Sequence, residues 1–101
     1  MTAVDLPSEI SEPLRALLPA LADLGYLPIS AEYSENSFGN FIVRFQRPDT
    51  ASFQLTRDRG QFIIYGIPQD ELESAGLWRA FDVINELQPL LIRLLGSQTK
   101  S

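Results

Sequence analysis

The chain has 101 residues, of which 45% are hydrophobic and 21% charged; its formal net charge is −5, and it contains neither histidine nor cysteine. The lack of cysteine excludes disulfides, thiolate nucleophiles and cysteine-bound metals, and the lack of histidine removes the commonest acid–base group and metal ligand. The length suits one domain with one hydrophobic core.

The first 25 residues predict an arm followed by an amphipathic helix. Residues 1–10 contain turn-forming residues and are expected to form the arm. Ser11 stands where it could cap a helix, and four leucines between positions 14 and 21 follow the spacing of one helical face. Pro19 points away from that face and is expected to bend or split the helix, which Gly25 ends.

Four strand-like segments follow, joined by short turns. Residues 26–34 predict the first strand, and Pro28 indicates an edge position or a strand start because proline cannot donate a hydrogen bond to a neighbouring strand. Alternating apolar and polar residues predict two more strands, at residues 41–46 and 52–57. Residues 62–67 form an unbroken apolar run, which predicts a central strand covered on both faces.

Two turns in this region carry special residues. Gly39 and Asn40 suit a turn or a bulge before the second strand. Asp58 and Gly60 predict a three-residue bulged hairpin in which Gly60 takes the positive φ. The two arginines that flank Asp58 have two interpretations: an exposed basic tip, or ion-pair partners of Asp58 and of neighbouring acids.

The last third of the chain predicts a polar connection and a second amphipathic helix. Residues 69–76 are expected to hold one helical turn. Asp82 is placed to cap a helix with one leucine-rich side, and Gly96 is expected to stop it, which leaves residues 97–101 as a flexible tail. Trp78 is expected to pack in the core, with an exposed anchor for a partner as the alternative.

The predicted order is therefore helix, four strands, helix. Consecutive strands joined by short turns form an antiparallel meander, and two helices with one leucine face each bury it most simply on the sheet. The sequence predicts an α+β fold: a four-stranded antiparallel β-meander with an N-terminal and a C-terminal helix packed on one face. We expect a single domain over residues 1–101.

The charge is uneven along the chain. Residues 1–35 carry six acidic side chains against one arginine, residues 36–59 a net charge of +2, and residues 60–101 a net charge of −2. An acidic chain repels phosphate, which disfavours nucleic-acid binding, whereas an acidic face suits a basic protein partner; solubility is the alternative reason for the acidity. The sequence contains no secretory-signal pattern and no apolar run long enough for a membrane span, so we expect a cytoplasmic location.

Motifs of catalysis are missing from the sequence. The serines have no histidine partner, and the phosphate-binding glycine motifs do not occur. Glycoside hydrolysis requires a pair of carboxylates, and the candidates here are Asp70, Glu71 and Glu73. Because they lie on a polar connection, we interpret them as solvated charges. We therefore expect no enzymatic activity, no cofactor and no metal site.

The segments Ser37 to Asn40 and Arg57 to Gln61, with the alternating strand pair between them, resemble a pattern of small bacterial proteins. Many of those proteins resemble immunity proteins of contact-dependent and polymorphic toxin systems. The likeness covers less than a third of the chain. It implies a single-domain cytoplasmic inhibitor that binds a toxin domain, and many such toxins are basic nucleases.

Two hypotheses of function follow. The first is a protein-binding module that neutralises a cognate toxin domain by direct binding. Its predicted partner contacts are acidic and aromatic side chains: Glu32, Tyr33, Glu35, Asp70, Glu71, Glu73 and Trp78. The alternative is a structural or assembly protein that forms a homodimer or a larger oligomer, through the edge strand that holds Pro28 or through the leucine-rich last helix. A deep polar pocket would instead favour a small-ligand or enzymatic role.

Overall fold

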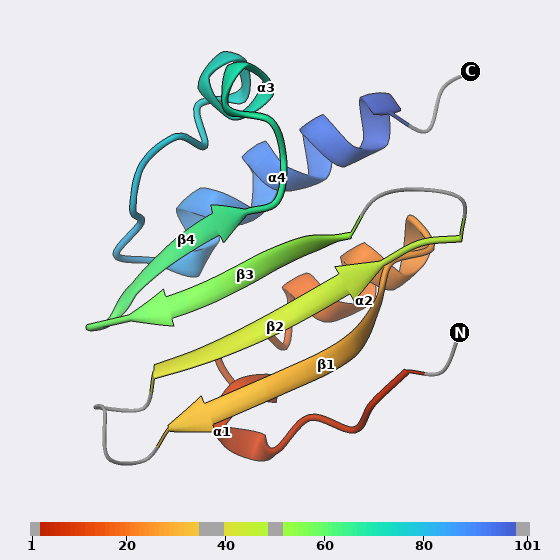
Figure 1. Ribbon diagram of the computed structural model, residues 1–101, viewed down its shortest axis with the longest axis vertical. Coiled ribbons are helices and arrows are strands. Elements are labelled where there is room, and N and C mark those ends of the chain that lie inside the picture. Colours follow the sequence, from red (N-terminus) through yellow and green to blue (C-terminus); the bar gives the residue numbers. More distant parts are fainter. Residues whose placement is uncertain (1–2, 35–39, 49–51, 99–101) are drawn as a thin grey trace.

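One antiparallel sheet, with helices on one of its faces, organises the molecule (Figure 1). The computed structural model describes residues 3–34, 40–48 and 52–98. The elements in chain order are α1 (Ser8–Ser11), α2 (Leu17–Asp23), β1 (Leu27–Ser34), β2 (Asn40–Gln46), β3 (Phe53–Asp58), β4 (Gln61–Tyr65), α3 (Gln69–Ala75) and α4 (Ile84–Gln98). The strands lie in the order β1-β2-β3-β4, each antiparallel to its neighbour. The predicted α+β meander is confirmed.

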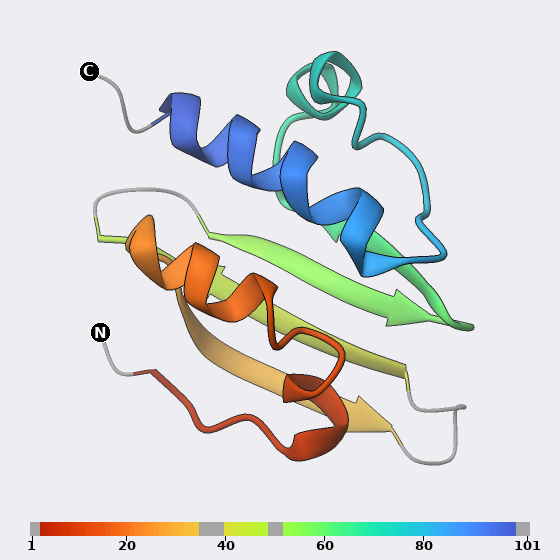
Figure 2. The same ribbon diagram turned by 180° about the vertical axis from the view of Figure 1, so that it is seen from behind.

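The core lies between the sheet and the helices α2 and α4, which lie on the same side of it (Figure 2). Alternate strand residues point to this side, as the period of two in a strand requires. The amide of Gln88 on α4 donates a hydrogen bond of 3.4 Å to the carbonyl of Ala16, just before α2. Buried side chains of the sheet and of the two helices meet there: Phe41, Val43, Phe45, Phe53, Leu55, Phe62, Ile64, Leu17, Leu21, Leu87, Leu91 and Leu95.

The N-terminal region forms two short helices instead of the one helix that the leucine spacing predicts. Ser11 ends α1, and residues 12–16 form turns before α2 begins at Leu17. Pro19 explains why a new helix begins at Leu17. Proline has no N–H to donate to the carbonyl of Arg15, which breaks a continuous helix, but the first turn of a new helix does not need that donor. The leucine face is nonetheless buried as predicted, with Leu14 at 0% exposure.

The first and last strands form the two edges of the sheet, and each edge meets another segment. The carbonyl of Pro28 on β1 accepts a hydrogen bond of 2.9 Å from the N–H of Val4. Phe81 pairs with Phe62 on β4 through two backbone hydrogen bonds, of 2.7 and 2.9 Å. Such contacts hinder edge-to-edge pairing between molecules. The edge position of Pro28 is confirmed.

The prediction that β4 is a central strand covered on both faces is wrong. β4 pairs with β3 on one side only, as the last strand in the order, and buried and more exposed residues alternate along it. Tyr65 is 49% exposed. An apolar run cannot distinguish a strand buried on both faces from an edge strand that leaves apolar side chains exposed.

The helix ends agree with the sequence in part. Gly25 ends α2 with φ +89°, and the N–H of Tyr26 donates to the carbonyl of Leu21, which completes a Schellman motif. Gly96, in contrast, lies inside α4, which continues to Gln98. Residues 97 and 98 of the predicted tail therefore belong to α4, and residues 99–101 lie outside the described part. The predicted arm likewise includes α1.

The polar connection after β4 folds into α3, which has two turns instead of the single predicted turn. The helix ends at Gly76 with φ +78°, and the N–H of Leu77 donates a hydrogen bond of 2.8 Å to the carbonyl of Leu72. Leu72 and Leu77 are both buried. Asp82, predicted to cap the last helix, lies two residues before α4, and its carboxylate accepts a hydrogen bond from Gln61.

Candidate functional site

The predicted partner contacts fall into two groups that the fold separates. Glu32 and Tyr33 lie on β1, at one edge of the sheet, whereas α3 and Trp78 follow β4 at the opposite edge (Figure 1). Glu35 lies outside the described residues. Since β2 and β3 stand between the two groups, a single small contact patch cannot include both.

Glu32 and Tyr33 point to opposite sides of the sheet. Glu32 is exposed on the side without helices, whereas Tyr33 is half-buried and packs against the core. Tyr33 begins a row of paired residues that crosses the helix-covered side of the sheet. In this row Tyr33 pairs with Phe41, Phe41 pairs with Arg57, and Arg57 pairs with Phe62. Adjacent residues of a strand alternate in direction, so these two neighbours cannot serve the same surface.

The second group forms a corner beyond β4 that we call the α3 corner: Asp70, Glu71 and Glu73 on α3, and Trp78 after it. Asp70 and Glu73 are exposed, and Glu71 is half-buried. Trp78 is 52% exposed, so the expectation that it packs in the core is wrong. Leu77 takes that place because the turn at Gly76 directs its side chain inward and leaves the next residue outside.

The turn between β3 and β4 has two residues instead of the predicted three. Asp58 still pairs with Gln61, and only Arg59 and Gly60 connect the strands, with φ of 54° and 80°. Positive φ at both positions is the type I′ geometry, which matches the twist of the strands. Gly60 has the predicted positive φ.

Asn40 holds this turn from the neighbouring strand. Its side-chain carbonyl accepts a hydrogen bond of 2.9 Å from the N–H of Arg59, and its amide donates one of 3.1 Å to the carboxylate of Asp58. The predicted turn residues Asn40, Asp58 and Gly60 thus meet in one structure, whereas Gly39 lies outside the described part. Sequence reasoning missed this contact because its partners are 18 and 19 positions apart.

The two arginines around Asp58 have different surroundings. Arg57 turns to the helix side, where its guanidinium lies 5.8 Å from the ring centre of Phe62 and its Nε is buried without a hydrogen-bond partner. Arg59 is exposed. The carboxylate of Asp58 accepts a hydrogen bond from Asn40, and the interpretation of an ion pair with a flanking arginine has no support within the described residues.

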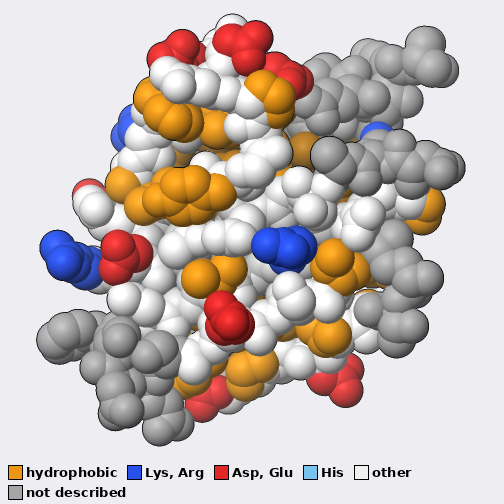
Figure 3. All heavy atoms as spheres, in the orientation of Figure 1, with side chains coloured by type: hydrophobic (Ala, Val, Ile, Leu, Met, Phe, Trp, Pro, Cys, Tyr) orange, Lys and Arg blue, Asp and Glu red, His pale blue; other side chains and the backbone are white. Residues whose placement is uncertain are grey.

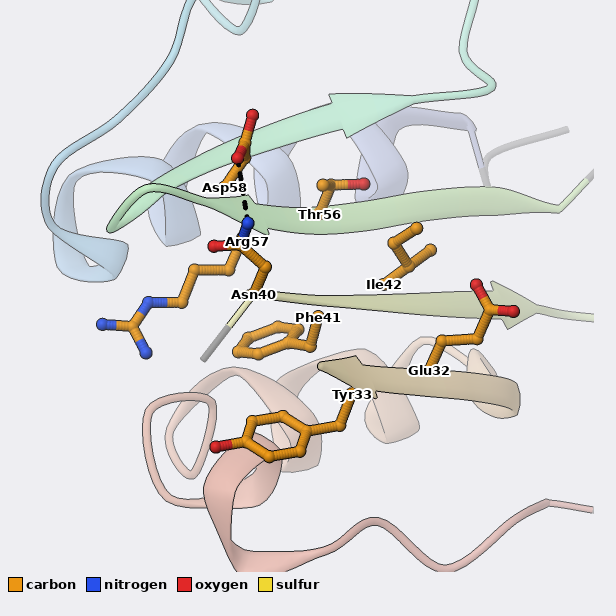
Figure 4. Close-up of a pocket in the computed structure, with 8 residues that line it drawn as sticks. All are labelled: Glu32, Tyr33, Asn40, Phe41, Ile42, Thr56, Arg57 and Asp58. Carbon is orange, nitrogen blue, oxygen red and sulfur yellow. Dashed lines mark hydrogen bonds between the residues drawn. The ribbon is translucent and has the colours of Figure 1, made fainter. Parts of the chain in front are cut away.

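A hollow of about 450 Å³ lies at this end of the sheet (Figure 4). Figure 4 shows Arg57 and Tyr33 pointing toward the end of the sheet where the β3–β4 turn lies, with Ile42 and Thr56 farther along the strands. The hollow opens to solvent, and the eight lining residues are Glu32, Tyr33, Asn40, Phe41, Ile42, Thr56, Arg57 and Asp58. It is not the deep polar pocket that would favour catalysis.

The side of the sheet without helices, which we call the open face, is the other large surface. Its residues form two rows across all four strands: Ser30, Arg44, Gln54 and Tyr65, then Glu32, Ile42, Thr56 and Ile63. Figure 3 views the molecule from this side, where hydrophobic and uncharged side chains predominate and acidic side chains gather at the top, over α3. The open face is thus chemically distinct from the α3 corner.

Within residues 3–34, 40–48 and 52–98, no three acidic side chains approach closely enough to hold a metal ion. No helix in the same ranges is long and apolar enough to cross a membrane. Comparisons of the chain with protein-family models, with curated proteins and with solved structures found no match. The surfaces described above are therefore the basis for a proposal of function.

Proposed function

We propose that the chain is a cytoplasmic, non-enzymatic binding module that neutralises a basic toxin domain by covering it with the α3 corner. The observation that carries the proposal is an exposed aromatic side chain a few residues along the chain from exposed acidic ones. Trp78 is 52% exposed and stands three residues after the end of α3, which bears Asp70 and Glu73. Because consecutive Cα atoms are about 3.8 Å apart, the Cα of Trp78 lies within about 11 Å of the Cα of Ala75.

Each component of the α3 corner has a part in binding. The exposed carboxylates attract a basic surface over a distance of about one Debye length, which speeds association. Tryptophan is the residue type most enriched among interface hot spots, and burial of its ring slows dissociation. The resemblance to immunity proteins supports a toxin domain as the partner, and a basic nuclease is the class that fits the charge.

The test uses the C-terminal domain of the protein encoded immediately upstream of this chain. Expressed alone in a bacterial host, that domain should arrest growth. Co-expression with this chain should restore growth, and the two purified proteins should form a stable complex. A domain that is harmless, or whose toxicity this chain does not relieve, would contradict the proposal.

Two sets of variants then test the contact surface. Asp70→Lys with Glu73→Lys should slow association by about tenfold at low salt, because the steering charge is reversed. Trp78→Ala should raise the dissociation rate by about thirtyfold, which corresponds to a hot spot of about 2 kcal/mol. The control is Glu9→Lys with Glu12→Lys, which changes the net charge equally on exposed residues at the N-terminal end. Equal effects of the control and the α3 variant would assign the binding to net charge alone.

A further inference from the structure

The open face carries more apolar surface than a sheet face that only contacts water requires. A water-facing strand side is usually polar, yet Ile42 and Ile63 stand in one row and Tyr65, 49% exposed, stands in the next. Leu27, 38% exposed, extends this apolar character along β1. No helix of residues 3–34, 40–48 and 52–98 lies over this face (Figure 1).

The two rows of the open face contain one acid and one base. Glu32 on β1 and Arg44 on β2 are both exposed, one row apart, and both line a hollow of about 280 Å³ over Ile42. Neither has an ion-pair partner in the part of the chain that the structure describes. The rows are therefore electrically balanced, in a chain whose net charge is −5.

We propose that the open face pairs with the open face of a second copy, so that Glu32 of each copy contacts Arg44 of the other. A two-fold axis parallel to the sheets relates the two copies. If Glu32 of the first copy contacts Arg44 of the second, the axis therefore also places Glu32 of the second copy against Arg44 of the first. The pairing buries Ile42 between two opposite-charge contacts. A basic partner would be repelled by Arg44, and an acidic partner would be repelled by Glu32. A second copy offers one acidic and one basic side chain, so charge complementarity favours it.

The size of the molecule permits this dimer. Figure 1 views it down its shortest axis, and the open face lies on the broad side of a molecule that measures 42 × 30 × 20 Å. A standard interface takes about 800 Å² from each partner, and the chain exposes 6085 Å² in total. The broad side has room for an interface of that size.

Each of the two surfaces that the sequence suggested for self-association already contacts another part of the chain. The backbone edge at Pro28 accepts a hydrogen bond from Val4, and the leucine face of α4 is buried, with Leu87 and Leu91 at 0% exposure. The proposed dimer uses neither surface. It also does not rest on the toxin-binding proposal, because none of its residues belongs to the α3 corner.

The experiment measures self-association by sedimentation equilibrium from micromolar to millimolar concentration. The native chain should form a dimer. Glu32→Arg and Arg44→Glu, each alone, should weaken the dimer by about tenfold or more, because each change places two pairs of like charges together. Glu12→Arg, with the same charge change as Glu32→Arg but at an exposed position between α1 and α2, should leave the dimer as strong as the native one.

The decisive measurement mixes the two single variants. In the mixture, both contacts again join opposite charges, so a heterodimer should form with about native strength. Circular dichroism of each variant should show native secondary structure. A native chain that is monomeric throughout overturns the proposal, as do single variants that dimerise at native strength or a mixture that does not recover. If Glu32 and Arg44 instead formed an ion pair within one chain, mixing the two variants would not restore the dimer.

Discussion

The two faces of the sheet are built from the same four strands, yet they differ in what they bury. On the covered face, Val43, Phe45 and Leu55 are at 0% exposure. On the open face, their neighbours Ile42 and Thr56 remain partly accessible to solvent. The comparison teaches that the stability of this protein depends mainly on one face, which leaves the residues of the other face available for contacts with a partner.

The largest effect should come from deletion of an apolar side chain on the covered face. Leu55→Ala should lower the free energy of unfolding by about 2–5 kcal/mol, because the cavity cannot close in a packed core. Ile63→Ala, an apolar deletion on the open face, should cost about 1 kcal/mol. Urea unfolding of dilute protein measures both values. Equal losses would show that the open face is as well packed as the core.

A smaller effect should come from the end of the open face, where Asn40 holds the β3–β4 turn. Asn40→Ala should cost about 1–2 kcal/mol, because two hydrogen bonds are lost. The amide of Arg59 should exchange its hydrogen faster, since Asn40 accepts its bond. Asn85→Ala, at an exposed position of α4, serves as the control and should change stability by less than about 0.5 kcal/mol. Unchanged exchange at Arg59 would contradict the contact.

The smallest effect should be a gain of stability at the turn itself. Arg59 has φ +54°, a conformation that asparagine tolerates better than arginine. Arg59→Asn should therefore raise the free energy of unfolding by a few tenths to about 1 kcal/mol, measured in urea. Gly60→Ala should lower it by about 1 kcal/mol through backbone strain alone, because a Cβ there meets nothing within 4 Å. A loss of stability in Arg59→Asn would show that the arginine side chain has a contact of its own.

Much of the fold was predictable because local patterns encode it. The alternation in residues 41–46 and 52–57 depends only on the period of a strand, and Gly25 ends a helix through hydrogen bonds to residues just before it. The edge position of Pro28 follows from its missing N–H. These signals lie within a few residues of the structures they predict.

The α3 corner was predictable as a group because its residues lie in one short segment of the chain, whereas the separation of the other predicted contacts from it was not. Glu32 and Tyr33 are adjacent in sequence but point to opposite faces, and the α3 corner lies beyond the far edge. The open face was not predicted, since its rows combine residues of four strands and become visible only once the register is known.

The sequence by itself determined the meander, the leucine faces of the helices and a set of side chains without histidine or cysteine, because propensity, period and side-chain type are local properties. The tertiary structure alone decided which apolar side chains remain exposed. It placed β4 at an edge, turned Leu77 inward and Trp78 outward, and brought Asn40 to Arg59. These outcomes depend on which segments compete for the same buried space, and that competition involves residues far apart in the chain.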